Sequence, residues 1–295
     1  MEVKQATTQS SPNTEATTKK TKKRSKTIHR NVQIIVGAVI IATFVLVALF
    51  APAVAPQDPL DIAVQRRLQE PSEAHILGTD ELGRDVLSRL IFGTRISLTV
   101  GVMASLIGAF IGSVIGMIAG YYGGRIDVAI GIMINIMLAL PGILLGLTIV
   151  TILGASTTNV IIALSIFAIP VFTRVVRGST LNIRKLEYID AIKAVGATDF
   201  RIITRHIFPN ILSPIIVQAT LYVATAIVVA ASLSFLGLGT QPPTPEWGTM
   251  LSNGRDFMRQ APHLTFYPGV MILLVVLGFN LIGDGLRDAL EPKGR

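Results

Sequence analysis

Long apolar runs alternate with polar segments along this chain, and their lengths indicate the solvent around the fold. Five runs have about the 20 residues that a helix needs to cross the hydrocarbon core of a bilayer, and one is shorter. None of the six contains Asp, Glu, Lys, Arg or His, which are costly at mid-bilayer. The runs are Ile34 to Val54, Leu98 to Gly120, Val128 to Val150, Val160 to Thr173, Ile211 to Ser234 and Leu264 to Ile282. The pattern predicts an all-α integral membrane protein with six transmembrane helices.

Prolines and glycines predict where these helices bend and pack. The short fourth run contains Pro170, so we expect its helix to begin earlier, near Thr157. Pro141 predicts a kink in the third run, because proline removes a backbone hydrogen bond. In the second run, glycines recur at every fourth residue over 108–120 and so lie near one helix face. This face allows close approach of another helix, either inside the bundle or between two membrane subunits, and we favour packing inside the bundle.

The distribution of charged residues predicts on which side of the membrane the two ends of the chain lie. Hydrophobic residues make up 51% of the sequence and charged residues 15%, with a net charge of +8. With the amino terminus inside, the cytoplasmic segments hold most of the 26 Lys and Arg residues, which is the positive-inside bias. An even number of spans then puts the carboxyl terminus in the cytoplasm as well. Residues 1–30 form a basic tail almost without large apolar side chains, for which we expect disorder and contact with lipid headgroups rather than with nucleic acid.

Two polar segments lie on the outer side in this arrangement. In the first, Thr79 is a candidate cap of an amphipathic helix with an Asp85–Arg89 pair. Four side chains of this segment are possible metal ligands, but helical spacing does not bring them to one point, so a solvated or interfacial helix is favoured. They are His75, Asp80, Glu81 and Asp85. The second outer segment holds Trp247, the chain's only tryptophan, as an interface anchor or a contact for an outside partner.

Several kinds of chemistry are missing from the sequence. No Gly-x-x-x-x-Gly-Lys-Ser/Thr loop is present, so the chain lacks the familiar phosphate-binding motif for ATP. No Gly-x-Ser-x-Gly elbow or His-Glu-x-x-His helix is present, and cysteine is absent. We therefore expect no catalytic residues, no metal and no cofactor bound by this chain.

The polar interruption at 178–209 is the best-defined functional candidate. Tyr188, Ile189, Ile192 and Val195 fall near one face of a short helix that Gly196 ends. Thr198 is a candidate cap for a second helix, in which Phe200, Ile203 and Ile207 form an apolar stripe before Pro209 opens the fifth span. On pattern alone, the segment is either a docking surface or an amphipathic loop that rests on the membrane.

This segment resembles the coupling loop of binding-protein-dependent ABC importer permeases. Asp190, Ala191, Gly196 and Pro209 match its signature, although Asp190 stands where a glutamate is usual. Ile192 replaces a usual alanine and His206 a usual isoleucine. Three further stretches are similar to the dipeptide, oligopeptide and nickel group, above all to its second permease subunit. They are 78–85, 232–248 and 283–288.

The resemblance implies a type I ABC importer bundle of the MetI-like kind in the bacterial cytoplasmic membrane. Its implied parts are a tail (1–30), an amino-terminal region with the first span and outer loop (31–96), a transmembrane type-1 domain (97–286) and a second tail (287–295). The implied partners are a homologous permease, two ATPase subunits that bind ATP, and an extracytoplasmic solute-binding protein. The implied cargo is a di- or oligopeptide, including glutathione.

Three alternatives follow from the same sequence. A nickel or other solute importer has the same motifs. An ion-coupled secondary transporter is disfavoured by the charge-free spans, although Asn135, Gln218 and Asn280 leave a sodium site open. A membrane scaffold explains the docking segment but not the six spans.

Overall fold

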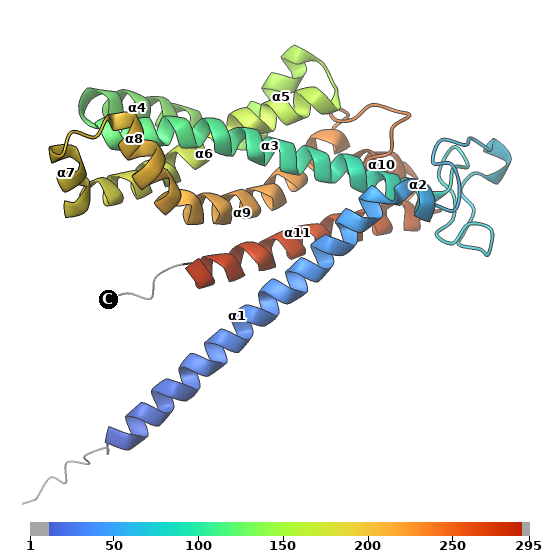
Figure 1. The fold of residues 1–295 in the computed structure, drawn as a ribbon. Coiled ribbons are helices and arrows are strands. Elements are labelled where there is room, and N and C mark those ends of the chain that lie inside the picture. Colours follow the sequence, from blue (N-terminus) through green and yellow to red (C-terminus); the bar gives the residue numbers. More distant parts are fainter. Residues whose placement is uncertain (1–11, 291–295) are drawn as a thin grey trace, which may run out of the picture.

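The computed structural model describes residues 12–290, with side chains from Asn31 onward, and its regular structure is helical. Figure 1 shows long helices lying alongside one another, with short helices and loops gathered at both ends. The helices are α1 (Pro12–Leu49), α2 (Ala51–Val54), α3 (Val86–Tyr122), α4 (Gly124–Ala139), α5 (Gly142–Leu153), α6 (Thr157–Arg184), α7 (Glu187–Ala194), α8 (Asp199–Ile202), α9 (Phe208–Phe235), α10 (Trp247–Gly254) and α11 (His263–Leu290). The described residues also form the 3-10 turns η1 (Val64–Arg66) and η3 (Arg255–Phe257) and the π-helical turn η2 (Ile203–Ile207).

The predicted set of spans is confirmed. Among the described residues, five helices are long and apolar enough to cross a membrane, and α4 with α5 adds a sixth if that bent pair is one span. The bend between α4 and α5 is 88°, so the kink predicted at Pro141 is a complete break. Leu140 adopts an extended backbone conformation because the proline ring disfavours helical geometry in the residue before it. Helix α6 begins at Thr157, as expected.

Helix α1 extends beyond its predicted span. It begins at Pro12, so residues 12–30 are helical where the sequence predicted disorder. The physical reason is that a helix already formed in the apolar part can propagate cheaply, and residues 13–30 contain no glycine or proline to stop it. Residues 1–11 of the predicted amino-terminal tail and residues 291–295 of the predicted carboxyl-terminal tail lie outside the described residues.

Helices α3 and α6 form the most extensive helix pair, and the spaced glycines of α3 lie in the seam between them. A Cβ atom added at Gly112 would lie 2.7 Å from the carbonyl oxygen of Ile169, and one at Gly116 would lie 2.8 Å from that of Thr173. Gly108 and Gly120 meet α6 in the same way. The glycines therefore allow close packing inside this chain, which confirms the favoured interpretation.

The outer segment before α3 differs from its prediction. Asp85, not Thr79, is the N-cap of the helix, and its carboxylate accepts hydrogen bonds from the backbone N–H and the hydroxyl of Ser88 at 2.8 Å. The other carboxylate oxygen lies 3.1 Å from His75 Nδ1. Both carboxylate oxygens of Asp85 thus have partners, one in the helix cap and the other in His75. The predicted pair of Asp85 with Arg89 does not form.

Arg89 instead joins a buried network of charges. Asp80 Oδ2 lies 2.7 Å from Arg84 Nε and 3.3 Å from Arg89 Nε, and all three residues are buried. Arg84 also donates a hydrogen bond to Glu81 Oε1 at 3.0 Å. The expected solvated or interfacial helix is therefore wrong, because these charges neutralise one another inside the fold. Within the part of the chain that the structure describes, no three His, Asp or Glu side chains meet in a way that could hold a metal ion.

Trp247 is buried rather than placed at an interface. Its exposed fraction is 0%, and its indole N–H donates a hydrogen bond to the carbonyl of Leu90 at 3.1 Å. The ring packs edge-on against Phe44, with 5.8 Å between centroids. The second outer segment therefore folds back onto α3 and α1, and the tryptophan is not accessible to lipid or to an outside partner.

We expect Gly112→Ala to destabilise the helix bundle, because the added methyl group meets the α6 backbone and forces the two helices apart. Overpacking of this kind costs about 1–3 kcal/mol. Gly131→Ala on α4 is the matched control, since nothing lies within 4 Å of its added Cβ. The measurement is the thermal stability of the two variants in detergent. A Gly112→Ala protein as stable as the control would contradict the packing role of the seam.

Candidate functional site

The segment that the sequence singled out joins α6 to α9 at one end of the bundle. In Figure 1 its helices α7 and α8 lie at the left end, opposite α2, α10 and the outer loops. Helix α6 ends at Arg184, and α7 begins at Glu187 after a single turn. The segment therefore extends both α6 and α9 beyond the apolar bundle.

Two backbone motifs define the angle between α7 and α8. The N–H of Gly196 donates to the carbonyl of Lys193 at 3.0 Å, and the N–H of Ala197 donates to that of Ile192 at 3.3 Å. This pair of bonds is a Schellman motif, which needs a left-handed residue, and Gly196 supplies it with φ of +89°. The hydroxyl of Thr198 then accepts a bond from the N–H of Arg201 and caps α8. The predicted helix end and cap are both confirmed.

An apolar cluster anchors the segment to the long helices. Its buried members come from the segment and from the three helices around it, and they are Tyr121, Val176, Ile189, Ile202, Ile207 and Ile211. The hydroxyl of Tyr121 at the end of α3 also donates a hydrogen bond to Asp199 Oδ1 of α8 at 2.6 Å. The segment is therefore attached to α3, α6 and α9 together, and it does not hang from the bundle as a free loop.

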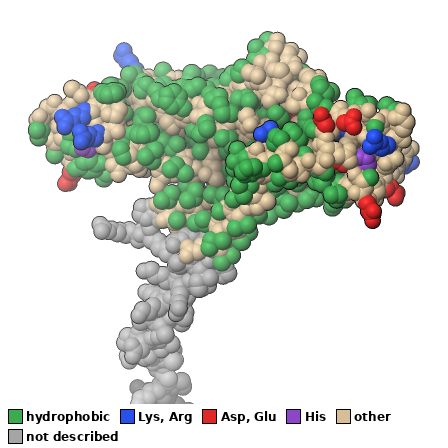
Figure 2. Space-filling model, turned by 45° about the vertical axis from the view of Figure 1, so that its right-hand side comes forward, with side chains coloured by type: hydrophobic (Ala, Val, Ile, Leu, Met, Phe, Trp, Pro, Cys, Tyr) green, Lys and Arg blue, Asp and Glu red, His purple; other side chains and the backbone are tan. Residues whose placement is uncertain are grey.

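The opposite face of the segment is exposed and partly apolar. Val195 is 89% exposed, Phe200 77% and Tyr188 40%. Charged side chains are exposed among them, namely Glu187, Asp190, Lys193, Arg201 and Arg205. Figure 2 shows Lys and Arg side chains in blue gathered at this end of the molecule, with apolar side chains around them.

The predicted face of four apolar residues divides in two. Ile189 is 2% exposed and Ile192 is half-buried, so both help to attach α7 to the bundle, while Tyr188 and Val195 point outward. The remaining predicted residues, Asp190, Ala191, Gly196 and Pro209, are exposed.

Phe200 is an exposed residue that the sequence analysis grouped with Ile203 and Ile207 in one apolar stripe. Helical residues are about 100° apart around the axis, so Phe200 lies about 200° from the buried Ile202. The predicted stripe left out Ile202, which is buried. An apolar residue at this position is the sequence signal that would have placed Phe200 on the opposite, exposed face of the helix.

The chain matches two known families of membrane transport proteins. Residues 112–295 match the family described as binding-protein-dependent transport system inner membrane component, and residues 28–71 match the N-terminal transmembrane domain of oligopeptide transport permease C. The first match covers more than half of the chain. This chain belongs to that family. It is a multi-pass inner membrane permease, and the exposed segment lies within the matched region.

Curated relatives agree with the family. The permease is 50% identical to the dipeptide transport system permease protein DppC of Alkalihalophilus pseudofirmus over 91% of this chain and 88% of that protein. It is 45% identical to the glutathione transport system permease protein GsiD of Pectobacterium atrosepticum over 88% and 86% of the two chains. The fold is similar to a chain in an inward-facing structure of the MetNI methionine ABC transporter, with a TM-score of 0.57 and 20% identity over 69% of this permease and 97% of that chain. The expected MetI-like bundle is thereby confirmed.

Proposed function

We propose that this permease forms half of the membrane path of an ATP-driven importer of di- and oligopeptides, with glutathione among its candidate solutes. The relatives named for dipeptide and glutathione transport, 45–50% identical over most of the chain, support this class of cargo. In the proposed assembly a second homologous permease completes the path, and an extracytoplasmic solute-binding protein delivers the solute. Two ATPase subunits bind and hydrolyse ATP, so the permease itself carries no catalytic site.

The observation that carries the coupling role is the two-sided character of the α7–α8 segment. Its inner face packs into the cluster around Ile189 and Ile202, and its outer face exposes Tyr188, Val195 and Phe200. A surface of this kind can bury aromatic and aliphatic side chains in a groove of a partner. We place the ATPase at this surface. Because the segment is anchored to three helices, a movement of the ATPase displaces the helices and not a flexible loop.

The same proposal orients the chain in the membrane. Basic side chains gather at the α7–α8 end, which the positive-inside bias places in the cytoplasm. Helix α11 ends on this side, and α1 begins there in the proposed topology. Both termini are then cytoplasmic, and the outer loops meet the binding protein.

Measurements of solute uptake by cells test which solute the permease carries. A strain that lacks this chain should lose uptake of a labelled dipeptide or of glutathione, keep uptake of nickel, and recover when the chain is restored. The recovered uptake should persist when the ion gradient is collapsed and stop when ATP is depleted. Loss of nickel uptake alone would contradict the peptide assignment, and dependence on the gradient alone would contradict ATP drive.

We expect Gly196→Val to abolish most transport while the permease stays in the membrane. The position has φ of +89°, and a β-branched residue there is strained, which costs of order 1–3 kcal/mol and changes the angle between α7 and α8. Gly196→Asn should keep more activity, because Asn tolerates the left-handed region better. Gly178→Val on α6 is the control, since its added Cβ meets nothing within 4 Å and its φ is ordinary. Equal uptake by all three variants would rule out a role for the helix angle in coupling.

A charge at the exposed face should separate the permease from its ATPase. Val195→Asp puts a carboxylate where we propose a buried contact, and such a change at an interface centre weakens binding by about tenfold or more. The measurement is the amount of ATPase that co-purifies with the tagged permease. Asn182→Asp adds the same charge at an exposed site near the end of α6, outside α7 and α8, and should have little effect. Full co-purification of the Val195→Asp variant would place the ATPase elsewhere.

A further inference from the structure

A cavity of about 370 Å³ lies between α6, α9 and α11. Its lining residues are close to the end of α6, the beginning of α9 and the end of α11, so it sits on the inner side of the bundle, near the α7–α8 segment. Small-molecule sites commonly measure about 300–1,000 Å³, and this volume falls within that range. Most of the wall is apolar and consists of Val175, Pro214, Val217, Leu221 and Leu290.

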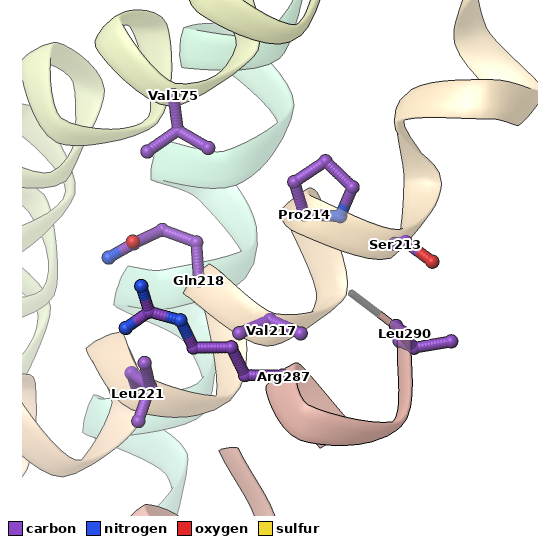
Figure 3. Close-up of a pocket in the computed structure, with 8 residues that line it drawn as sticks. All are labelled: Val175, Ser213, Pro214, Val217, Gln218, Leu221, Arg287 and Leu290. Carbon is purple, nitrogen blue, oxygen red and sulfur yellow. The ribbon is translucent and has the colours of Figure 1, made fainter. Parts of the chain in front are cut away.

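Two polar side chains converge in this apolar surrounding. Figure 3 shows Arg287 reaching from α11 toward Gln218 of α9, with its guanidinium group beside the Gln218 amide. Arg287 lies in the stretch 283–288 and Gln218 lies inside the fifth apolar run, and the coupling role uses neither residue. A guanidinium group carries five N–H donors in a planar fork that matches a carboxylate. Arg287 can therefore bind a carboxylate in addition to any contact that it makes within the chain.

We infer that this cavity is an inner solute site that binds the carboxyl terminus of the transported peptide. The inference rests on the proposed function, which supplies a solute with a free carboxylate. Arg287 binds the carboxylate, the Gln218 amide hydrogen-bonds to the peptide backbone, and the apolar wall takes the solute's side chains. The site therefore selects for a free carboxylate, a feature that dipeptides and glutathione share and that a hydrated nickel ion lacks.

The cavity lies between helices that the α7–α8 segment connects, so a movement of that segment can change solute binding. Its walls belong to α6 and α9, the two helices that α7 and α8 connect. Pro214 lies on the wall inside α9, and a proline there leaves the carbonyl four residues earlier, that of Asn210, without its helical hydrogen bond. The helix is thus weakest where it lines the cavity. A displacement of α7 and α8 changes the shape of the site, so the site can hold the solute in one state and release it in another.

The natural absence of cysteine gives a direct test. A single cysteine is introduced at Ser213 or, as a second reporter, at Val217, and its reaction with a maleimide is followed in membranes that contain the assembled importer. Dialanine in excess should slow the labelling, and dialanine amide, which lacks the carboxylate, should slow it much less. Thr220→Cys on α9 lies outside the cavity lining and should show no protection.

Variants of the two polar residues identify the groups that bind. Arg287→Gln should remove the protection by dialanine and lower dipeptide uptake by about tenfold or more, because hydrogen bonds to charged groups contribute that much. Arg287→Lys should restore part of both, and Gln218→Leu should weaken both. Arg125→Gln removes a charge at the same end of the bundle, outside the cavity, and should behave like the unchanged permease. Each variant should be present in the membrane in the same amount as the unchanged permease and should unfold at a similar temperature in detergent, which excludes a merely structural defect.

The outcomes separate this inference from the proposed function. If the unchanged permease imports no peptide, the proposed function fails. If it imports dialanine but the solute protects neither reporter, or if Arg287→Gln leaves uptake unchanged, the cavity is not the solute site. Equal protection by dialanine and its amide would overturn the role of the carboxylate.

Discussion

The close approach of α3 and α6 positions both ends of the permease. Four glycines let the α6 backbone lie against α3 where side chains would keep the helices apart. At the outer end, α3 begins within the buried network of Asp80 and Arg89. At the inner end, Tyr121 of α3 holds Asp199 of α8, and α6 leads directly into α7. The outer turn before α3 and the α7–α8 segment are therefore both placed relative to one pair of helices.

The sequence predicts the spans well because the bilayer sets a simple rule for them. Apolar length and the exclusion of charge decide which residues can cross, and α6, α9 and α11 begin within a few residues of their predicted positions. The ends extend further than predicted where polar residues find partners inside the fold. Helix α3 begins at Val86, well before the apolar run, because Asp80 neutralises Arg89 in the buried turn.

Side-chain partners decide what the sequence could not predict. The sequence predicts that Asp85 pairs with Arg89 on a helix. In the structure Asp85 caps α3, and Arg89 forms an ion pair with Asp80 instead. Trp247 was expected at an interface, but the carbonyl of Leu90 accepts its N–H inside the core. In the candidate site the Gly196 turn and the Thr198 cap follow from local backbone chemistry and were predictable. The inward turn of Ile189 and the outward turn of Phe200 depend on how α3, α6 and α9 surround the segment.

The two ends of the permease differ in what holds them together, and this difference suits a bundle that must change shape. The outer end depends on ion pairs and capped turns with strict geometry, such as that of Asp80 with Arg84. The inner end has fewer polar contacts, such as the ion pair of Arg177 with Asp127. It also depends on aliphatic packing around Ile202 and Ile207, which tolerates small sliding movements better than directional bonds do. Helix α9 also carries Pro214 in its inner half, while the α3–α6 seam has close backbone contacts along its length. We therefore expect α9 to move more at the inner end than the closely packed α3–α6 pair does.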